Sequence, residues 1–450
     1  MRLPLFVFLA VAACGQVSDR RAGIDGLWLS EGYGNLFEIS ADTIRSYEVS
    51  RVSCLPSFVA AKVESSPGAT AFRMVDGRFT FLFLPDSAAP DRARFHVNGT
   101  ASDMFVRRAE RKPPQCDRPT PDTPRSNFET FVAIWREQYP FFELKGADWD
   151  GIAAANREAV TDSTPPERLF EILRGMFEPF EDAHTFLVAE SLGLRAGGRR
   201  LSPSWVDWPD RERAHALVER YLTRPLAKFN EGQLEFGMLG EDIGYLRIRS
   251  FGRYHPDGTF ESGLTALEAT LDTIFTGADR WIGMVIDVRI NTGGADPYGL
   301  AIAARLTDRE YVAYAKQARS DPYDPSKWTA EQPSVVRPSP RPGFRGPVVE
   351  LIGIQSISAA ETFTQALFGR RPAVVRIGGH TQGVFSDVLG RRLPNGWRFG
   401  LPNERFVTEG RSFDGPGIPA EVEVESFTPA GIRSGRDAGI ERAMAVLRAR

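Results

Sequence analysis

The sequence has few cysteines and few histidines for its length, and its C-terminal part has no lysine. Among 450 residues there are three cysteines and five histidines, and no lysine follows Lys327. A catalytic lysine is therefore excluded from the residues after Lys327. Histidine, the side chain that changes charge near neutral pH, has only five possible positions.

The sequence also lacks a large excess of charge of one sign. Its formal net charge is -3 and its pI is about 6.1, so nothing in it indicates a nucleic-acid partner or binding to an anionic membrane surface. After the N-terminus no apolar run is long enough to span a bilayer. Hydrophobic residues make up 42% and charged residues 25%, which is typical of a soluble globular protein. The length predicts two or three domains.

The N-terminus does contain an apolar run. The segment "MRLPLFVFLAVAACGQ" has one basic residue, Arg2, then apolar residues up to Ala13 and then Cys14. This pattern predicts a secretory signal peptide over residues 1–14, too short for a spanning helix. Residues 11–14 also resemble the lipobox of a bacterial lipoprotein signal. That resemblance implies lipidation of Cys14 and a lipid-anchored protein of the cell envelope, on the periplasmic face of a membrane. An ordinary signal peptide cut nearby is the alternative.

Two cysteines remain once Cys14 is assigned to the signal, namely Cys54 and Cys116. An exported compartment permits disulfides, which persist in oxidising surroundings. We therefore expect a bond between Cys54 and Cys116. Two buried thiols are the alternative.

Residues 15–110 are expected to form a small antiparallel β domain. Runs such as "AFRMVDGRFTFLFL" and "ARFHVNGT" alternate in polarity or are rich in aromatic and β-branched residues, and Asp76-Gly77 is a hairpin signal. Residues 111–126, "RKPPQCDRPTPDTPRS", are rich in proline and charge and are predicted to be a linker.

The rest of the chain changes from a helical to an alternating pattern. Residues 127–240 are expected to form a helical subdomain, because apolar residues in "SNFETFVAIWREQYPFFE" and "TPPERLFEILRGMFEPF" recur at helical spacing. Ser126 is the expected N-cap of the first helix. In residues 241–450, apolar strands such as "WIGMVIDVR" and "GPVVELIGI" alternate with helices, which predicts an α/β core with a parallel-type sheet. The roughly fifty residues between Leu187 and Glu241 are too few for an inserted PDZ domain, so we predict none.

Two serines stand where a core strand meets a helix. In "GIQSISAAETF", Ser356 and Ser358 follow an apolar strand and are surrounded by small residues. A serine there lies at the carboxyl edge of an α/β sheet, where ligands bind, and the helix start offers free N–H groups to an oxyanion. In "VIDVRINTGGADP", Gly293 and Gly294 can likewise expose N–H groups to a ligand. A helix N-cap and a tight turn are the respective alternatives.

A serine nucleophile needs a base. The histidines are His96 in the β domain, His215 in a charged helix, His255 in a loop-like segment, His184 in "EDAHTFL" and His380 in "IGGHTQG". The residues alone rank His184 and His380 about equally. A Ser–Lys dyad with its lysine downstream of Ser358 is impossible, because no lysine is present there.

Together these stretches resemble the tricorn-core and C-terminal-processing (tail-specific) serine peptidase family. The similar stretches lie in the family's order over residues 131–425; they include "FEDAHTFL", "GYLRIRSF", "VIDVRINTGG", "SISAAETF", "GGHTQGVFSD" and "GIPAEVEVE". The resemblance implies an α/β fold with a ClpP/crotonase-like core, a peptide or protein substrate, and no cofactor or metal. The N-terminal β domain lies outside the resemblance.

The resemblance also implies roles for individual residues. Ser358, three residues before Glu361, corresponds to the nucleophile, which leaves Ser356 as a turn or packing residue. The tail-specific branch uses a downstream lysine that this chain lacks, whereas the tricorn branch uses a histidine, which corresponds to His184 as general base. Asp414 corresponds to the acid that orients this histidine, with Glu404 as its rival.

Backbone N–H groups of Gly293 or Gly294 and of Ala359 correspond to the oxyanion hole. Glu361 needs no role beyond a favourable interaction with the helix dipole. One residue departs from the family, because Ala183 stands where the family has a serine before the histidine.

The expected function is therefore that of an exported serine endopeptidase that works through an acyl-enzyme. A non-catalytic protein that binds a lipid or peptide on the same fold is the main alternative, in which Ala183 marks decay of the site. A structural lipoprotein of the cell envelope, with the β domain as its working part, is a third interpretation without a supporting motif.

Overall fold

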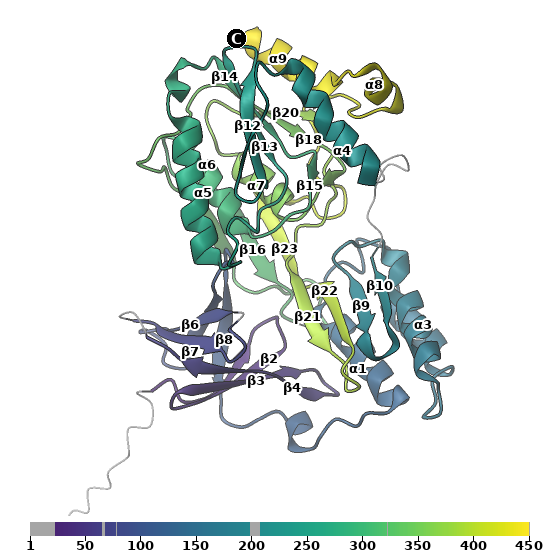
Figure 1. Cartoon of the computed structure of the whole chain (residues 1–450). Helices are drawn as coiled ribbons and strands as arrows, with labels where there is room; N and C mark the ends of the chain where they lie inside the picture. Colours follow the sequence, from purple (N-terminus) through teal and green to yellow (C-terminus); the bar gives the residue numbers. More distant parts are fainter. Residues whose placement is uncertain (1–22, 65–67, 78, 199–207, 322, 450) are drawn as a thin grey trace, which may run out of the picture.

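The computed structural model describes residues 23–64, 68–77, 79–198, 208–321 and 323–449. The predicted signal peptide and the lipidation site at Cys14 lie outside these residues. In the described ranges, no helix is both long and apolar enough to cross a membrane. Figure 1 shows a barrel, a group of helices with a small sheet, and a larger α/β part.

Eight strands near the N-terminus form a closed antiparallel barrel. They are β1 (Gly26–Ser30), β2 (Asn35–Ser40), β3 (Thr43–Val49), β4 (Cys54–Lys62), β5 (Thr70–Met74), β6 (Thr80–Pro85), β7 (Arg92–Val97) and β8 (Asp103–Ala109). Alternate side chains such as Phe81 and Phe83 of β6 are buried inside, as the period of a half-buried strand requires. This confirms the predicted antiparallel β domain, and the pairing of β1 with β8 closes it.

The predicted linker is fixed to the barrel by a disulfide and by hydrogen bonds of Lys112, Gln115 and Thr120. A short 3₁₀ helix, η1 (Pro114–Asp117), carries Cys116, which forms a disulfide with Cys54 at the start of β4. The first long helix, α1 (Pro124–Gln138), begins inside the predicted linker. Its N-cap is Thr123, whose hydroxyl accepts a hydrogen bond from the Ser126 N–H. The expected cap at Ser126 is therefore wrong, because Pro124 begins the helix at a position that proline favours.

Helices and strands alternate in the region that the sequence predicts to be helical. The helices are α1, α2 (Trp149–Arg157), α3 (Pro166–Phe177) and η2 (Glu178–Phe180); β9 (Phe186–Ala189), η3 (Glu190–Leu192) and β10 (Leu194–Gly197) follow. The helices share an aromatic core around Trp135. Strand β9 pairs with β22 (Arg398–Pro402), which pairs with β21 (Val388–Arg392), so the sheet has the order β10-β9-β22-β21. A hairpin from the C-terminal part of the chain thus completes this subdomain.

The α/β part is built on a seven-stranded sheet in the order β11-β12-β13-β14-β18-β20-β25. Its strands are β11 (Ala227–Phe229), β12 (Leu234–Leu239), β13 (Ile243–Ile248), β14 (Gly283–Asp287), β18 (Val348–Ile352), β20 (Val375–Gly378) and β25 (Val422–Glu423). The pairs from β13 to β25 are parallel. Because β12 forms an antiparallel hairpin with β13, the domain boundary expected at residue 240 falls inside this sheet.

Helices cover both faces of this sheet. They are α4 (Trp208–Leu217), η4 (Val218–Tyr221), α5 (Phe260–Phe275), η5 (Ala278–Arg280), α6 (Asp296–Ala304), α7 (Ala359–Ala366), α8 (Pro429–Ser434) and α9 (Ala438–Arg448). Successive residues of a strand point to opposite faces. Thus Ile286 of β14 packs in the core formed with α5, α6 and α7, whereas Val285 packs in the core formed with α9. The strands are buried on both faces, which explains their continuous apolar sequence.

Two smaller sheets complete the fold. Strands β15 (Ile290–Asn291) and β19 (Gln355–Ser356) pair in parallel, and β17 (Gln332–Val336), β16 (Tyr311–Ala318), β23 (Glu404–Thr408) and β24 (Arg411–Ser412) form a four-stranded sheet in that order. The latter sheet contacts the barrel, because the Gln332 side chain bonds both the N–H and the carbonyl of Asp103. The absence of a PDZ domain stays a prediction.

Candidate active site

Ser358 lies between β19 and α7, at the joint of strand and helix that the sequence predicts. Its backbone has φ 59° and ψ -122°, a positive φ that a serine rarely adopts and that the surrounding structure must hold in place. Its side chain is half-buried. Ser356 is buried instead; its hydroxyl donates to the Val288 carbonyl at 2.7 Å and accepts from the Gly353 N–H at 3.1 Å. Ser356 thus has the contacts of a packing residue.

Glu361 holds the Ser358 backbone and a second loop together. Its buried carboxylate accepts hydrogen bonds from the N–H of Ser358 at 3.2 Å, of Gly383 at 2.6 Å and of Val384 at 2.9 Å. Burial raises the pKa of this carboxyl to about 7, although these hydrogen bonds oppose the rise. Glu361 therefore does more than interact with the helix dipole, the only role expected from sequence.

Two glycines approach Ser358 from the neighbouring loop. Gly293 has φ +79°, and a Cβ at this position would come within 2.7 Å of the Ser358 Cβ, so only glycine fits. Its N–H donates to the Asn291 side chain at 2.8 Å, which leaves it unavailable to an oxyanion in this arrangement. The adjacent Gly294 pairs with Phe251 in an isolated parallel β-bridge. The N–H groups that donate in this bridge are those of Phe251 and Ala295, so the Gly294 N–H takes no part in it. Ala359 is the first residue of α7, where a helix leaves N–H groups unbonded.

His184 lies in a turn just before β9 and lines a small cavity. Residues of five separate segments line this cavity: Phe141, Leu144 and Lys145; Asp182 and His184; Gly383, Val384, Phe385 and Ser386; Pro402; and Gly415. The Asp182 carboxylate accepts hydrogen bonds from the His184 backbone N–H at 2.9 Å and from the Tyr139 hydroxyl at 3.1 Å. Gly383 and Val384 are also the donors to Glu361, so the loop they form lies between the Ser358 backbone and His184.

The two acids that the sequence offers lie in different surroundings. Asp414 is buried and precedes Gly415 of the His184 cavity; its carboxyl accepts from the Ser412 hydroxyl at 2.7 Å. Burial raises its pKa to about 7, and the Asp182 charge adds to the rise. Glu404 instead bonds Tyr33 of the barrel at 2.6 Å and pairs with Lys316 at 3.2 Å. Asp414 is therefore better placed than Glu404 to orient His184.

Lys316 is a buried lysine upstream of Ser358, and the absence of lysine after Lys327 does not exclude it as a catalytic group. It lies on β16 and pairs with Asp387 at 2.6 Å as well as with Glu404. Burial alone lowers its pKa, but the charges of Asp387, Glu404 and Asp296 raise the pKa well above its usual value. Lys316 is thus a fixed cation and is unsuited to act as a general base.

None of the other four histidines, all of which the structure describes, lines the cavity that contains His184. His96 bonds Asp103 in the barrel, and His255 is exposed beside Asp257. His215 is buried near Arg247, and burial lowers its pKa to about 3. His380 is exposed, with Nδ1 at 2.7 Å from the Thr381 carbonyl.

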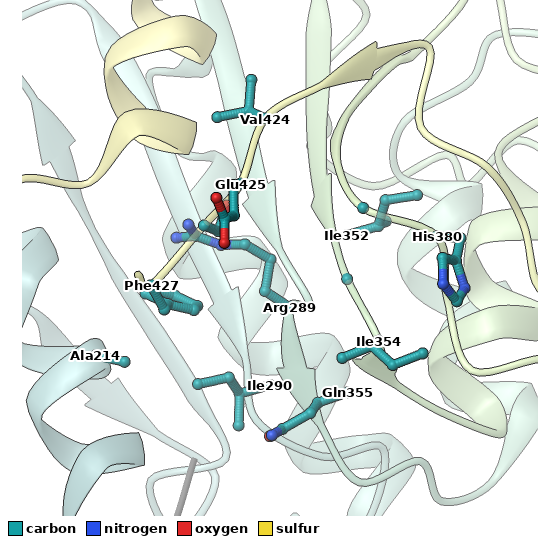
Figure 2. Close-up of a pocket in the computed structure, with 13 residues that line it drawn as sticks. Ala214, Arg289, Ile290, Ile352, Ile354, Gln355, His380, Val424, Glu425 and Phe427 are labelled. Carbon is teal, nitrogen blue, oxygen red and sulfur yellow. The ribbon is translucent and has the colours of Figure 1, made fainter. Parts of the chain in front are cut away.

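His380 lines a cavity of about 210 Å³ at the carboxyl ends of β18 and β20. Figure 2 shows its ring on the opposite side of the cavity from Arg289, Glu425 and Phe427. The Arg289 guanidinium is buried and is already paired with Asp287 and Asp437. In the described ranges, no group of three or more His, Cys, Asp or Glu side chains is arranged to hold a metal ion.

Sequence alone predicts no role for Asp182 and Lys316, and for Glu361 it predicts only an interaction with the helix dipole. Asp182 is two residues before His184, and its spacing in "EDAHT" was an available signal. The partners of Glu361 and Lys316 are distant in sequence, so no local pattern marked them.

Comparison with known proteins concerns the α/β part of the chain and the fold. Residues 242–424 match the model of peptidase family S41. This range contains Ser358, both glycines and Asp414 but excludes His184. No curated protein matches the chain.

Several solved structures resemble the fold, and two of them illustrate the likeness. The first is a candidate peptidase from Parabacteroides merdae ATCC 43184, with 25% identity and a TM-score of 0.60 over 73% of this chain and 97% of that chain. The second is mature CPAF in complex with lactacystin, with 13% identity and a TM-score of 0.51 over 73% of this chain and 98% of that chain. The second likeness concerns the fold alone.

Proposed function

Because residues 242–424 match the model of peptidase family S41, we propose that this protein is a serine endopeptidase that hydrolyses peptide bonds through Ser358. Members of such a family are serine hydrolases, and the domain implies a peptide or protein substrate. The observation that carries the proposal is the buried Glu361 carboxylate, which bonds the Ser358 backbone and also the loop at residues 383 and 384 that lines the His184 cavity.

The proposed reaction has two steps. His184 accepts the proton of the Ser358 hydroxyl, the oxygen attacks the peptide carbonyl, and the protonated imidazole then gives its proton to the leaving amine. In the second step the same imidazole takes a proton from water, whose oxygen attacks the acyl carbonyl. The bond to the Ser358 oxygen breaks, and that oxygen takes the proton back from the imidazolium. The developing oxyanion is bound by the N–H groups of Ala359 and Gly294, since the Gly293 N–H donates to Asn291. Asp414, which precedes Gly415 of the same cavity, orients the imidazole, and Asp182 holds the His184 backbone N–H.

Hydrolysis of a fluorescein-labelled, denatured casein tests the proposal. We expect Ser358→Ala to reduce the rate at least about 10³-fold, as loss of a nucleophile does, and His184→Ala to act similarly. Ser356→Ala and His380→Ala are the matched controls and should retain the rate within a few-fold. A Ser358→Ala protein as active as its parent would exclude the proposed nucleophile.

The same fold offers a second function, that of a ligand-binding protein without catalysis. Two observations favour it: Ala183 stands beside His184 in place of a hydroxyl residue, and a cavity of about 210 Å³ lies at the carboxyl edge of the sheet. A cavity of this size accommodates an aromatic or aliphatic group. A well-folded parent without hydrolytic activity that binds an apolar ligand in this cavity would favour this function.

We also propose that the protein is exported and lipid-anchored at the cell envelope through Cys14. The sequence of residues 1–14 supports this, and so does the Cys54–Cys116 disulfide, because such bonds persist in oxidising compartments. Metabolic labelling with a fatty acid tests it: Cys14→Ser should abolish the label, and label on the Cys14→Ser protein would contradict the assignment.

A further inference from the structure

A second cavity, of about 380 Å³, lies between the barrel and the sheet β10-β9-β22-β21. The barrel contributes an apolar wall made of Phe58, Met74, Phe79, Phe81 and Val97; Phe186, Gly390, Arg392 and Arg398 lie on the opposite wall. The rings of Phe58 and Phe81 stack at 4.9 Å, and 48% of Phe79 remains exposed. Figure 1 shows the β21–β22 hairpin extending toward the barrel.

The strand register places several side chains of this sheet in rows on the face toward the barrel. One row runs Arg392, Arg398, Val188, Arg195 across the four strands, and the next runs Gly390, Gly400, Phe186, Gly197. Residues two apart on a strand share a face, so both rows lie on the same surface. A Cβ at Gly390 would meet nothing within 4 Å, whereas one at Gly400 would meet the side chains of Phe186 and Val388. The Gly390 end of this row, beside Arg392, therefore leaves room for an extended peptide. We call this surface the arginine face.

The arginine face carries positive charge that the protein does not fully balance. Arg392 and Arg195 are exposed, and neither forms an ion pair within the described residues. Arg398 pairs with Glu190 at the exposed rim. The nearby Glu48 carboxylate is buried and accepts from the Ser57 hydroxyl and the Arg392 backbone N–H. The guanidinium groups are thus open to carboxylates from outside.

The arginine face continues to the His184 cavity. Pro402, four residues after Arg398 on β22, lines the cavity that contains His184. Four residues of a strand span about 13 Å. Phe186, two residues after His184, is in turn part of the wall of the second cavity. An extended chain with one end at His184 would therefore reach the arginines after about four residues.

We propose that the arginine face binds an extended segment of the peptide substrate through its acidic side chains, about four residues from the scissile bond. The position of the scissile bond rests on the proposed function, whereas binding of the acidic segment does not. Guanidinium groups suit carboxylates because they offer several N–H donors in one plane. The apolar barrel wall receives side chains that alternate with the acidic ones.

Fluorescence anisotropy tests the binding without requiring catalysis. The Ser358→Ala protein lacking residues 1–14 is titrated against two amidated, fluorescein-labelled decapeptides of alanine and leucine, one with two adjacent glutamates and one with glutamines there. We expect the glutamate peptide to bind about three- to tenfold more tightly, a range set by exposed ion pairs. The difference should shrink as salt rises.

Matched variants locate the effect. Arg392→Gln/Arg398→Gln should remove the preference for glutamate, whereas Arg280→Gln/Arg433→Gln, the same charge change at exposed residues elsewhere, should keep it. Equal binding of the two peptides by the parent would overturn the proposal. A preference that appears only when the peptides have a free C-terminal carboxylate, and not with the glutamates, would overturn it as well.

Cleavage mapping separates this proposal from the proposed function. With the active parent and denatured casein, we expect cleavage sites to lie about three to five residues from acidic residues, and the spacing to be lost in Arg392→Gln/Arg398→Gln. Cleavage without that spacing contradicts the arginine face and leaves the peptidase standing. Preferential binding of the glutamate peptide without any cleavage would contradict the peptidase and leave the arginine face standing.

Discussion

At the scale of single residues, Glu361 is the side chain that best explains how the Ser358 loop is held. Three backbone N–H groups converge on one buried carboxylate. The sequence could place Ser358, because a strand, small residues and a helix mark it locally. It could not show the bonds of Glu361 to Gly383 and Val384, because those partners come from a loop that only the folded sheet brings close.

Glu361→Gln should therefore disturb the loop, although glutamate and glutamine have nearly the same size. An amide presents one oxygen and one NH₂ group, so at least one of the three N–H donors faces another donor. We expect a loss of about 1–3 kcal/mol in the free energy of unfolding and slower hydrolysis. Urea unfolding and casein hydrolysis measure these effects.

Glu350→Gln is the matched control for that variant. Glu350 is equally buried and accepts from the Thr364 hydroxyl at 2.9 Å, a bond that an amide oxygen can keep. Its hydrolysis rate should equal that of the parent. If both variants lose activity equally, Glu361 has no special role in holding the Ser358 loop.

Glu350 also predicts a dependence of stability on pH. Burial raises its pKa from the usual value near 4.5 to about 7. Below pH 4.5 the carboxyl is protonated in both states, and its contribution is fully present. As pH rises to 7, only the unfolded chain releases the proton, so the free energy of unfolding falls.

Urea unfolding of the parent and of Glu350→Gln at several pH values isolates this contribution. The stability of the parent relative to the variant should decrease from pH 4.5 to 7 by a few kcal/mol and then level off. A constant difference between the two proteins across this range would contradict the assigned pKa.

At the scale of elements, the alternation of apolar strands and helices predicted the α/β core, because strands buried on both faces read as continuous apolar runs. The same reasoning did not predict the sheet β10-β9-β22-β21. Its strands are short, and β9 pairs with β22, about two hundred residues further along the chain. For the same reason, the local pattern suggested a purely helical subdomain.

The segment η1 shows how one covalent bond fixes an otherwise irregular linker. The disulfide joins residues 62 positions apart. We expect Cys54→Ser/Cys116→Ser to lower the free energy of unfolding of the barrel by about 2–5 kcal/mol, because the unfolded chain regains freedom. Casein hydrolysis, which depends on the core, should change little. An unaltered unfolding curve would show that the bond does not support the barrel.

At the scale of the whole molecule, the barrel is joined to the core by buried polar bonds as well as by the chain. Tyr33 donates to Glu404 at 2.6 Å, and Glu404 in turn pairs with Lys316 of the core. Neither the closure of the barrel nor this contact could be predicted from sequence, because both depend on pairs of residues far apart in the chain. The antiparallel strands themselves were visible from their alternation.

Tyr33→Phe tests this contact. The variant removes one hydroxyl and leaves a buried carboxylate with one partner fewer, so we expect a loss of about 1–3 kcal/mol in the free energy of unfolding. Tyr323→Phe, at a residue that is 68% exposed, is the control and should be neutral. Equal stability of the two variants would show that the contact contributes nothing measurable.

The central claim is that Ser358 is an activated nucleophile with His184 as its base. Labelling with a fluorophosphonate tests it most directly, because the reagent reacts covalently with activated serines whatever the natural substrate is. The protein without residues 1–14 is labelled, digested and analysed by mass spectrometry, beside its Ser358→Ala, His184→Ala and His380→Ala variants. The account predicts one adduct on Ser358 that is lost with His184→Ala and kept with His380→Ala. A well-folded parent that carries no adduct on Ser358, or one that keeps it without His184, would contradict it.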